Sequence, residues 1–110
     1  MAGPSFITNF RPKGALGSTL LQMTPTTSTW VQLASNPASE VAISNTCGGT
    51  LQVARSSTPG SNIFNLANGQ IYFFFVQGNT NELWVNTATA SPTAIGMDIR
   101  NFSGALQNMS

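Results

Sequence analysis

From residue 18 onward the chain is a series of short stretches in which apolar and polar residues alternate, separated by turn-forming residues. In the last of them, Ile95, Met97 and Ile99 alternate with polar Asp98 and Arg100. Alternation with a period of two residues is typical of a β-strand that buries one face. The stretches of this kind are 18–24, 28–34, 40–44, 50–55, 62–66, 70–76, 82–86 and 93–102. Eight short strands without helical periodicity predict an antiparallel β-sandwich, jelly-roll-like in its strand number.

The turn-forming residues also indicate which strands form hairpins. A glycine-rich connection, residues 45–49, joins strand 40–44 to strand 50–55. Two alternating runs joined by a short glycine-containing loop predict a β-hairpin, here with Val41 and Ile43 facing the core. Leu51 and Val53 are expected to face the core from the second strand. Strand 70–76 follows the turn dipeptide Asn68-Gly69, and we expect strand 82–86 to be its hairpin partner.

Residues 1–17 differ from the rest because prolines and glycines interrupt any regular element there. We expect an extended N-terminal arm, followed by a sandwich domain over 18–103 and a short C-terminal tail over 104–110. A frayed terminus is the simplest alternative. Three large apolar residues in a tail are more than solubility requires, so we expect the arm to dock on a neighbouring protein. Its docking residues are Phe6, Ile7, Phe10, Arg11 and Lys13.

Strand 70–76 is apolar on both faces, whereas a sandwich strand normally presents one face to water. We expect Ile71, Phe73 and Phe75 to face the core, so that the alternate residues of the strand need a second cover. Either the chain's own arm or loops, or another subunit, could supply it. Aromatic residues are enriched at interface cores, which favours a homo-oligomer. The predicted subunit interface comprises Tyr72, Phe74, Val76, Trp84 and Trp30.

The chain offers few groups for chemistry. It has no histidine, one cysteine (Cys47) and three acids (Glu40, Glu82 and Asp98), each isolated in sequence. Nucleophilic catalysis needs a base beside the nucleophile, and zinc sites use histidine and cysteine ligands. We therefore expect no catalytic, cofactor-binding or metal site, and no enzymatic activity.

Charge and hydropathy restrict the partners. The net charge is +1, from four scattered cations against three acids, whereas nucleic-acid-binding domains carry a basic stripe or patch. The longest apolar run, Ile71 to Val76, is far shorter than the ~20 residues that span a bilayer. We expect neither a nucleic-acid nor a membrane partner. Sugar binding stays open, because Tyr72, Trp30 and Trp84 with nearby asparagines could stack on and hydrogen-bond a glycan.

The segment from Ser44 to Asn86 carries a family resemblance. It contains Ser-Asn-Thr-Cys-Gly-Gly-Thr-Leu-Gln-Val-Ala-Arg, Asn-Leu-Ala-Asn-Gly-Gln-Ile-Tyr-Phe-Phe-Phe-Val-Gln-Gly and Asn-Glu-Leu-Trp-Val. This succession of strand types resembles the small all-β virion proteins of tailed bacteriophages. Among these proteins, the size of the chain and its predicted N-terminal arm look most like those of capsid decoration (cement) proteins.

The resemblance implies a structural role. Such proteins are made in the host cytoplasm, bind the outer surface of the expanded head, often as trimers, and bridge neighbouring capsomers. The implied partners are further copies of the chain, with a trimer favoured, and the major capsid protein. A tail- or fibre-associated protein with a host-glycan-binding role is the alternative.

Overall fold

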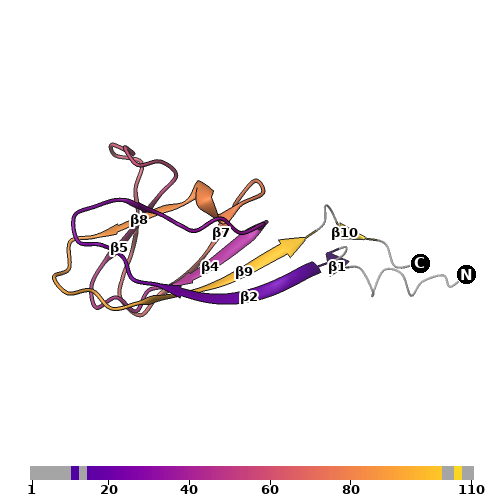
Figure 1. The fold of residues 1–110 in the computed structure, drawn as a ribbon, viewed down its shortest axis with the longest axis horizontal. Coiled ribbons are helices and arrows are strands. Elements are labelled where there is room, and N and C mark those ends of the chain that lie inside the picture. The colour runs from indigo at the N-terminus through magenta and orange to yellow at the C-terminus, as the bar shows by residue number, and fades with distance from the viewer. Residues whose placement is uncertain (1–10, 13–14, 103–105, 108–110) are drawn as a thin grey trace, which may run out of the picture.

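The computed structural model describes residues 11–12, 15–102 and 106–107, and these form two four-stranded antiparallel sheets (Figure 1). The first sheet has the order β2 (Ala15–Met23), β9 (Ile95–Phe102), β4 (Glu40–Ser44), β7 (Ile71–Phe75). The second has the order β3 (Val31–Gln32), β8 (Trp84–Thr87), β5 (Leu51–Ala54), β6 (Phe64–Leu66). The prediction of an antiparallel β-sandwich is confirmed.

Two shorter features complete the fold. Strand β1 (Arg11–Pro12) pairs with β10 (Leu106–Gln107) as a separate two-stranded sheet beside the ends of β2 and β9 (Figure 1). A 3₁₀ turn, η1 (Thr80–Glu82), precedes β8 and begins with a capping box between Asn79 and Glu82. The first long strand starts at Ala15, within the segment predicted as an arm.

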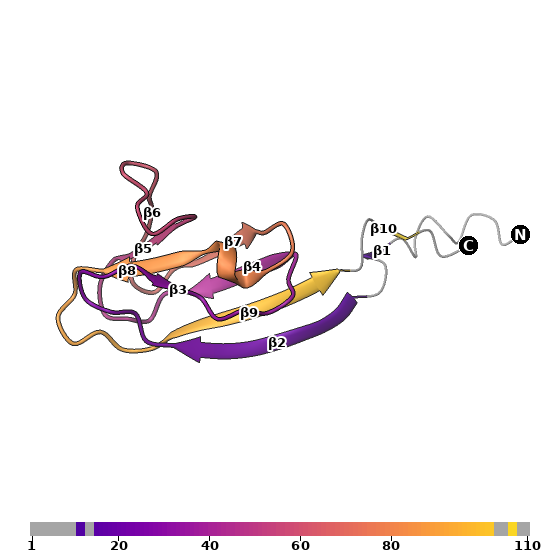
Figure 2. The same cartoon turned by 45° about the horizontal axis from the view of Figure 1, so that its top comes forward.

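The chain passes repeatedly from one sheet to the other, as the turned view in Figure 2 shows. Strands β4 and β5 lie in different sheets, so the predicted hairpin between 40–44 and 50–55 is wrong. Strand β7 pairs with β4 and not with β8, so the predicted hairpin partner of 70–76 is also wrong. Turn dipeptides specify that a chain reverses, but they do not specify which sheet it enters. Consecutive strands β5 and β6 do pair directly.

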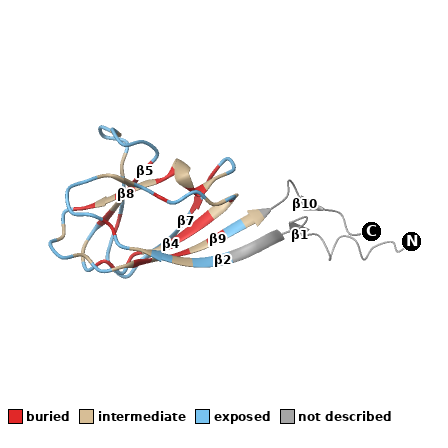
Figure 3. Ribbon diagram, in the orientation of Figure 1, coloured by how far each residue is buried: buried red, intermediate tan, exposed pale blue. Residues whose placement is uncertain are grey.

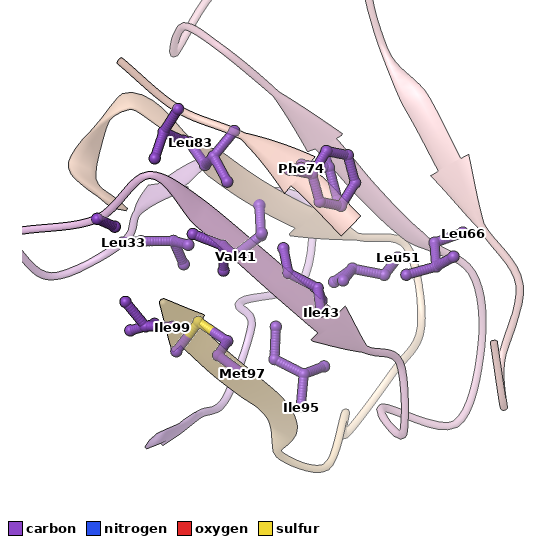
Figure 4. Packing of buried hydrophobic residues seen from close by; sticks show 14 of the residues in the cluster. Leu33, Val41, Ile43, Leu51, Leu66, Phe74, Leu83, Ile95, Met97 and Ile99 are labelled. Carbon is purple, nitrogen blue, oxygen red and sulfur yellow. The ribbon is translucent and has the colours of Figure 1, made fainter. Parts of the chain in front are cut away.

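The core lies between the sheets and is almost entirely aliphatic (Figure 4). Val41 and Ile43 of β4 face Leu51 and Val53 of β5 across it, as the alternation predicted. The inward residues of β9 are also buried as predicted, while Arg100 is exposed. The buried set is completed by Leu33, Ala38, Cys47, Leu66, Phe74, Val76, Leu83, Val85, Ile95, Met97 and Ile99. The inner face of each sheet therefore supplies the core, and the outer faces do not contribute to it.

Candidate functional site

The outer face of the β2-β9-β4-β7 sheet exposes four large apolar side chains. Leu20 is 78% exposed, Ile71 60%, Phe73 51% and Phe75 73%. We call these four residues the outer patch. Leu20 lies on β2 at one edge of the sheet, and the other three lie on β7 at the opposite edge. The largest exposed apolar patch of a soluble protein, a few hundred Å² in area, is often a functional contact surface.

Between the two edges the face is hollowed. Small residues on the middle strands, Ala42 and Ser44 of β4 and Gly96 of β9, form the floor, while Leu20 and Phe73 stand at the sides. The hollow has a volume of about 710 Å³. Small residues opposite large ones in register produce this shape, because Ala42 pairs with Phe73 and Ser44 with Ile71. The face therefore combines ridges with a depression.

The charged groups described on this face are Glu40, Asp98 and Arg100, with a net charge of −1. The guanidinium of Arg100 lies 3.2 Å from the carboxylate of Asp98, two residues away on the same strand. Glu40 of β4 stands in register with Arg100 of β9. Figure 3 marks exposed positions along β2 and β9 in pale blue. An exposed pair of this kind adds little to stability, and Asp98 also lines the hollow in the middle of the face.

The predicted subunit interface needs correction. Phe74 and Val76 are only 7% and 8% exposed and belong to the core, so it is wrong that their face points outward. The opposite face of β7, predicted to be inward, carries the exposed Ile71, Phe73 and Phe75. Both faces of the strand are apolar, so alternation could not decide between them. Leu20 was missed because a single apolar residue on a polar face gives no pattern.

Of the other members of that predicted interface, Tyr72 lies in one sheet and Trp84 in the other. Tyr72 is 45% exposed and packs at the side of the sandwich against Phe64 and Phe74, with ring centroids 4.3 and 4.9 Å away. Trp84 lies on β8 in register with Gln32 of β3, and it is half-buried, as is Trp30. The structure does not bring these three aromatic residues together on one surface.

The aromatic cluster of Phe64, Tyr72 and Phe74 borders a second hollow, also of about 710 Å³, beneath the loop that connects β5 to β6. Its polar lining comes from Arg55, Asn62 and loop hydroxyls. Arg55 Nη2 donates a hydrogen bond of 2.9 Å to the carbonyl oxygen of Phe75 on the edge strand β7. This hollow thus combines ring faces with hydrogen-bonding groups.

The predicted docking residues of the arm, Phe6, Ile7, Phe10 and Lys13, lie outside the described residues. The backbone of Arg11 is described and pairs with Gln107. Whether this segment docks on another protein stays a prediction.

Within the described part of the chain, no three His, Cys, Asp or Glu side chains gather where they could hold a metal ion. Over the same residues, no helix is long and apolar enough to cross a membrane. Cys47 is buried, and its thiol donates a hydrogen bond of 3.3 Å to the carbonyl oxygen of Gly49. The thiol thus has a local structural partner.

Comparisons with known proteins add little. No protein-family model matches the chain, and a search of curated proteins finds no match. Among solved structures, the chain is similar to a de novo designed double-stranded β-helix determined in solution by NMR. The identity is 16% and the TM-score 0.44, over 77% of this chain and 99% of the designed one.

Proposed function

We propose that this chain is a non-enzymatic structural protein of a tailed-phage virion, a capsid decoration protein that binds the outer surface of the head and bridges capsomers. The observation that carries the proposal is the outer patch. An exposed apolar face of this kind indicates a surface that binds another protein. The resemblance of residues 44–86 to small phage virion proteins supplies the kind of assembly.

The strand order supports a jelly roll as the scaffold. Eight strands form two sheets of four, and the chain changes sheet at each connection from β2 to β9 except β5 to β6. Jelly rolls consist of eight strands in two sheets, and viral capsid proteins and lectins are built on them. A fold does not by itself imply a function, so this is support for the scaffold alone.

The composition suits permanent assembly. Only 6% of the residues are charged and the net charge is +1, whereas isolated domains rely on net charge to stay apart. A decoration protein works by repetition, because weak contacts gain strength when many are made on one shell. In this proposal the arm residues Phe6, Ile7 and Phe10 contact the major capsid protein, and the sandwich supplies further contacts.

The test is co-sedimentation of the purified chain with expanded heads assembled from the major capsid protein encoded in the same genome. The chain should pellet with the heads, and replacing the three apolar arm residues by serine should abolish binding while the far-UV circular dichroism spectrum stays unchanged. A control with alanine at Ser56, Ser57 and Thr58 should still bind. A wild-type chain that stays in the supernatant would contradict the proposal.

A tail- or fibre-associated glycan binder is the second candidate, favoured by the hollow beneath the β5–β6 loop. Sugars bind proteins through ring stacking and hydrogen bonds, and this hollow offers Tyr72 and Phe64 beside Arg55 and Asn62. A glycan array separates the candidates. A defined glycan that binds the wild-type chain but not Tyr72→Ala would support this function, and an array without signal would reject it.

A further inference from the structure

We propose that the outer patch is the contact between two copies of this chain, which pack with the outer faces of their β2-β9-β4-β7 sheets against each other about a two-fold axis. This inference deepens the proposed function and rests on it in one respect, that the patch binds protein. It commits the patch to a second copy instead of the major capsid protein or the chain's own arm.

The outer patch supplies more than half of the area that a stable pair buries on each partner. A large side chain can bury roughly 200 Å², so the exposed fractions of Leu20, Ile71, Phe73 and Phe75 correspond to about 500 Å² of apolar surface. Stable interfaces bury about 800 Å² per partner, and their polar rims supply the remainder. Polar residues such as Gln22 border the patch.

The shape of the face favours a copy of itself. A two-fold contact requires a surface that is complementary to itself. This face has ridges, Phe73 and Phe75 on β7, and a hollow floored by Ala42, Ser44 and Gly96 on the middle strands. The two edge strands are three strand spacings apart, roughly 14 Å. The β7 ridge of one copy can therefore enter the hollow of the other, and the two-fold axis repeats the same contact.

Asp98 lines the hollow, and its carboxylate is already paired within its own chain. Arg100 is paired with Asp98 at 3.2 Å and stands in register with Glu40. Burying an unpaired charge at an interface is costly, but a pair that is already formed asks nothing of the partner.

Pairing through the β7 edge is the other way in which two copies could meet. An apolar edge strand invites such pairing, and proteins guard against it with charged side chains. Here Arg55 Nη2 donates a hydrogen bond of 2.9 Å to the carbonyl oxygen of Phe75, at the end of this edge strand. The geometry therefore points to contact through the sheet face, with the edge guarded by Arg55.

The experiment measures the molar mass of the full chain alone, by light scattering on a size-exclusion column at micromolar concentration. We expect twice the monomer mass of 11.6 kDa. The double variant Phe73→Glu/Phe75→Glu should raise the dissociation constant at least about 100-fold and elute as a monomer. The matched control Ser57→Glu/Asn65→Glu adds the same charge at exposed positions off the patch, and it should stay dimeric.

A second variant covers the case in which the glutamates disturb β7. Leu20→Lys changes the far edge of the patch, on β2, and should also give a monomer, while the control Asn65→Lys stays dimeric. A wild-type monomer or trimer, or a dimer that survives both patch variants, would overturn the proposal. Head binding is measured separately, so a dimer that ignores heads would reject decoration and keep this interface.

Discussion

The side-chain nitrogen of Asn45 donates a hydrogen bond of 2.7 Å to the carbonyl oxygen of Leu66, which ties the end of β4 to the end of β6 in the opposite sheet. The same nitrogen donates to the carbonyl oxygen of Gly49 at 2.8 Å, and the side-chain oxygen accepts from the backbone N–H of Cys47 at 3.0 Å. Asn45 is completely buried. The Asn45 side chain therefore holds the connection that carries the chain from β4 to β5 in the opposite sheet.

Replacing Asn45 by alanine should lower the free energy of unfolding by about 2–3 kcal/mol, because buried backbone groups lose their partners. Urea unfolding followed by tryptophan fluorescence measures the change. Asn65→Ala, at an exposed position of β6, should cost less than about 0.5 kcal/mol. Equal effects of the two variants would show that the crossing does not depend on this amide.

Adjacent phenylalanines on β7 should respond in opposite ways to truncation. Phe74→Ala empties a core position and should cost about 3–5 kcal/mol, whereas Phe73→Ala should stay within about 0.5 kcal/mol. The measurement belongs at the lowest concentration that fluorescence allows, because self-association adds concentration-dependent stability. A larger loss for Phe73→Ala than for Phe74→Ala would reverse the face assignment.

Gly49 lies where a side chain does not fit. A Cβ at this position would collide with Oγ1 of Thr89 and lie 3.2 Å from its Cβ. Gly49→Ala should cost about 1–3 kcal/mol through overpacking, and Thr89→Ala in the same chain should recover at least half of that loss. Gly96→Ala is the control, because its Cβ would meet Ser44 at an ordinary 3.7 Å. Strict additivity of the Gly49 and Thr89 changes would count against this contact.

Cys47 should be protected in the native protein because it is 1% exposed. A chromogenic disulfide reagent should modify the Cys47 thiol at least about 100-fold more slowly in the folded chain than in the urea-unfolded chain. The reagent reaches the buried thiol only when the structure opens locally. In Asn65→Cys the added thiol should react at once and Cys47 slowly. Rapid reaction of Cys47 in the folded wild-type chain would contradict this prediction.

Alternation of apolar and polar residues is enough to predict most of the strands and much of the core. Alternation is a local property, so it placed Val41 and Ile43 inward on β4, and it did the same for Ile95, Met97 and Ile99 on β9. It also located strand 40–44 at the bounds that the structure has. On both strands the opposite face carries polar residues, Glu40 and Ser44 on β4 and Asp98 and Arg100 on β9, so the apolar face is the one expected to enter the core.

The pairing of the strands, and the face of β7 that enters the core, depend on contacts between distant parts of the chain. Nothing local distinguishes Phe73 from Phe74, and the choice between them is made by register with β4, which pairs Phe74 with the buried Val41. The connections at 45–49 and 77–81 are predicted as hairpin turns, yet each carries the chain from one sheet to the other, and the buried Asn45 holds the first of them. Burial of the combined inner faces stabilises this arrangement, and that energy depends on contacts between residues far apart in the chain.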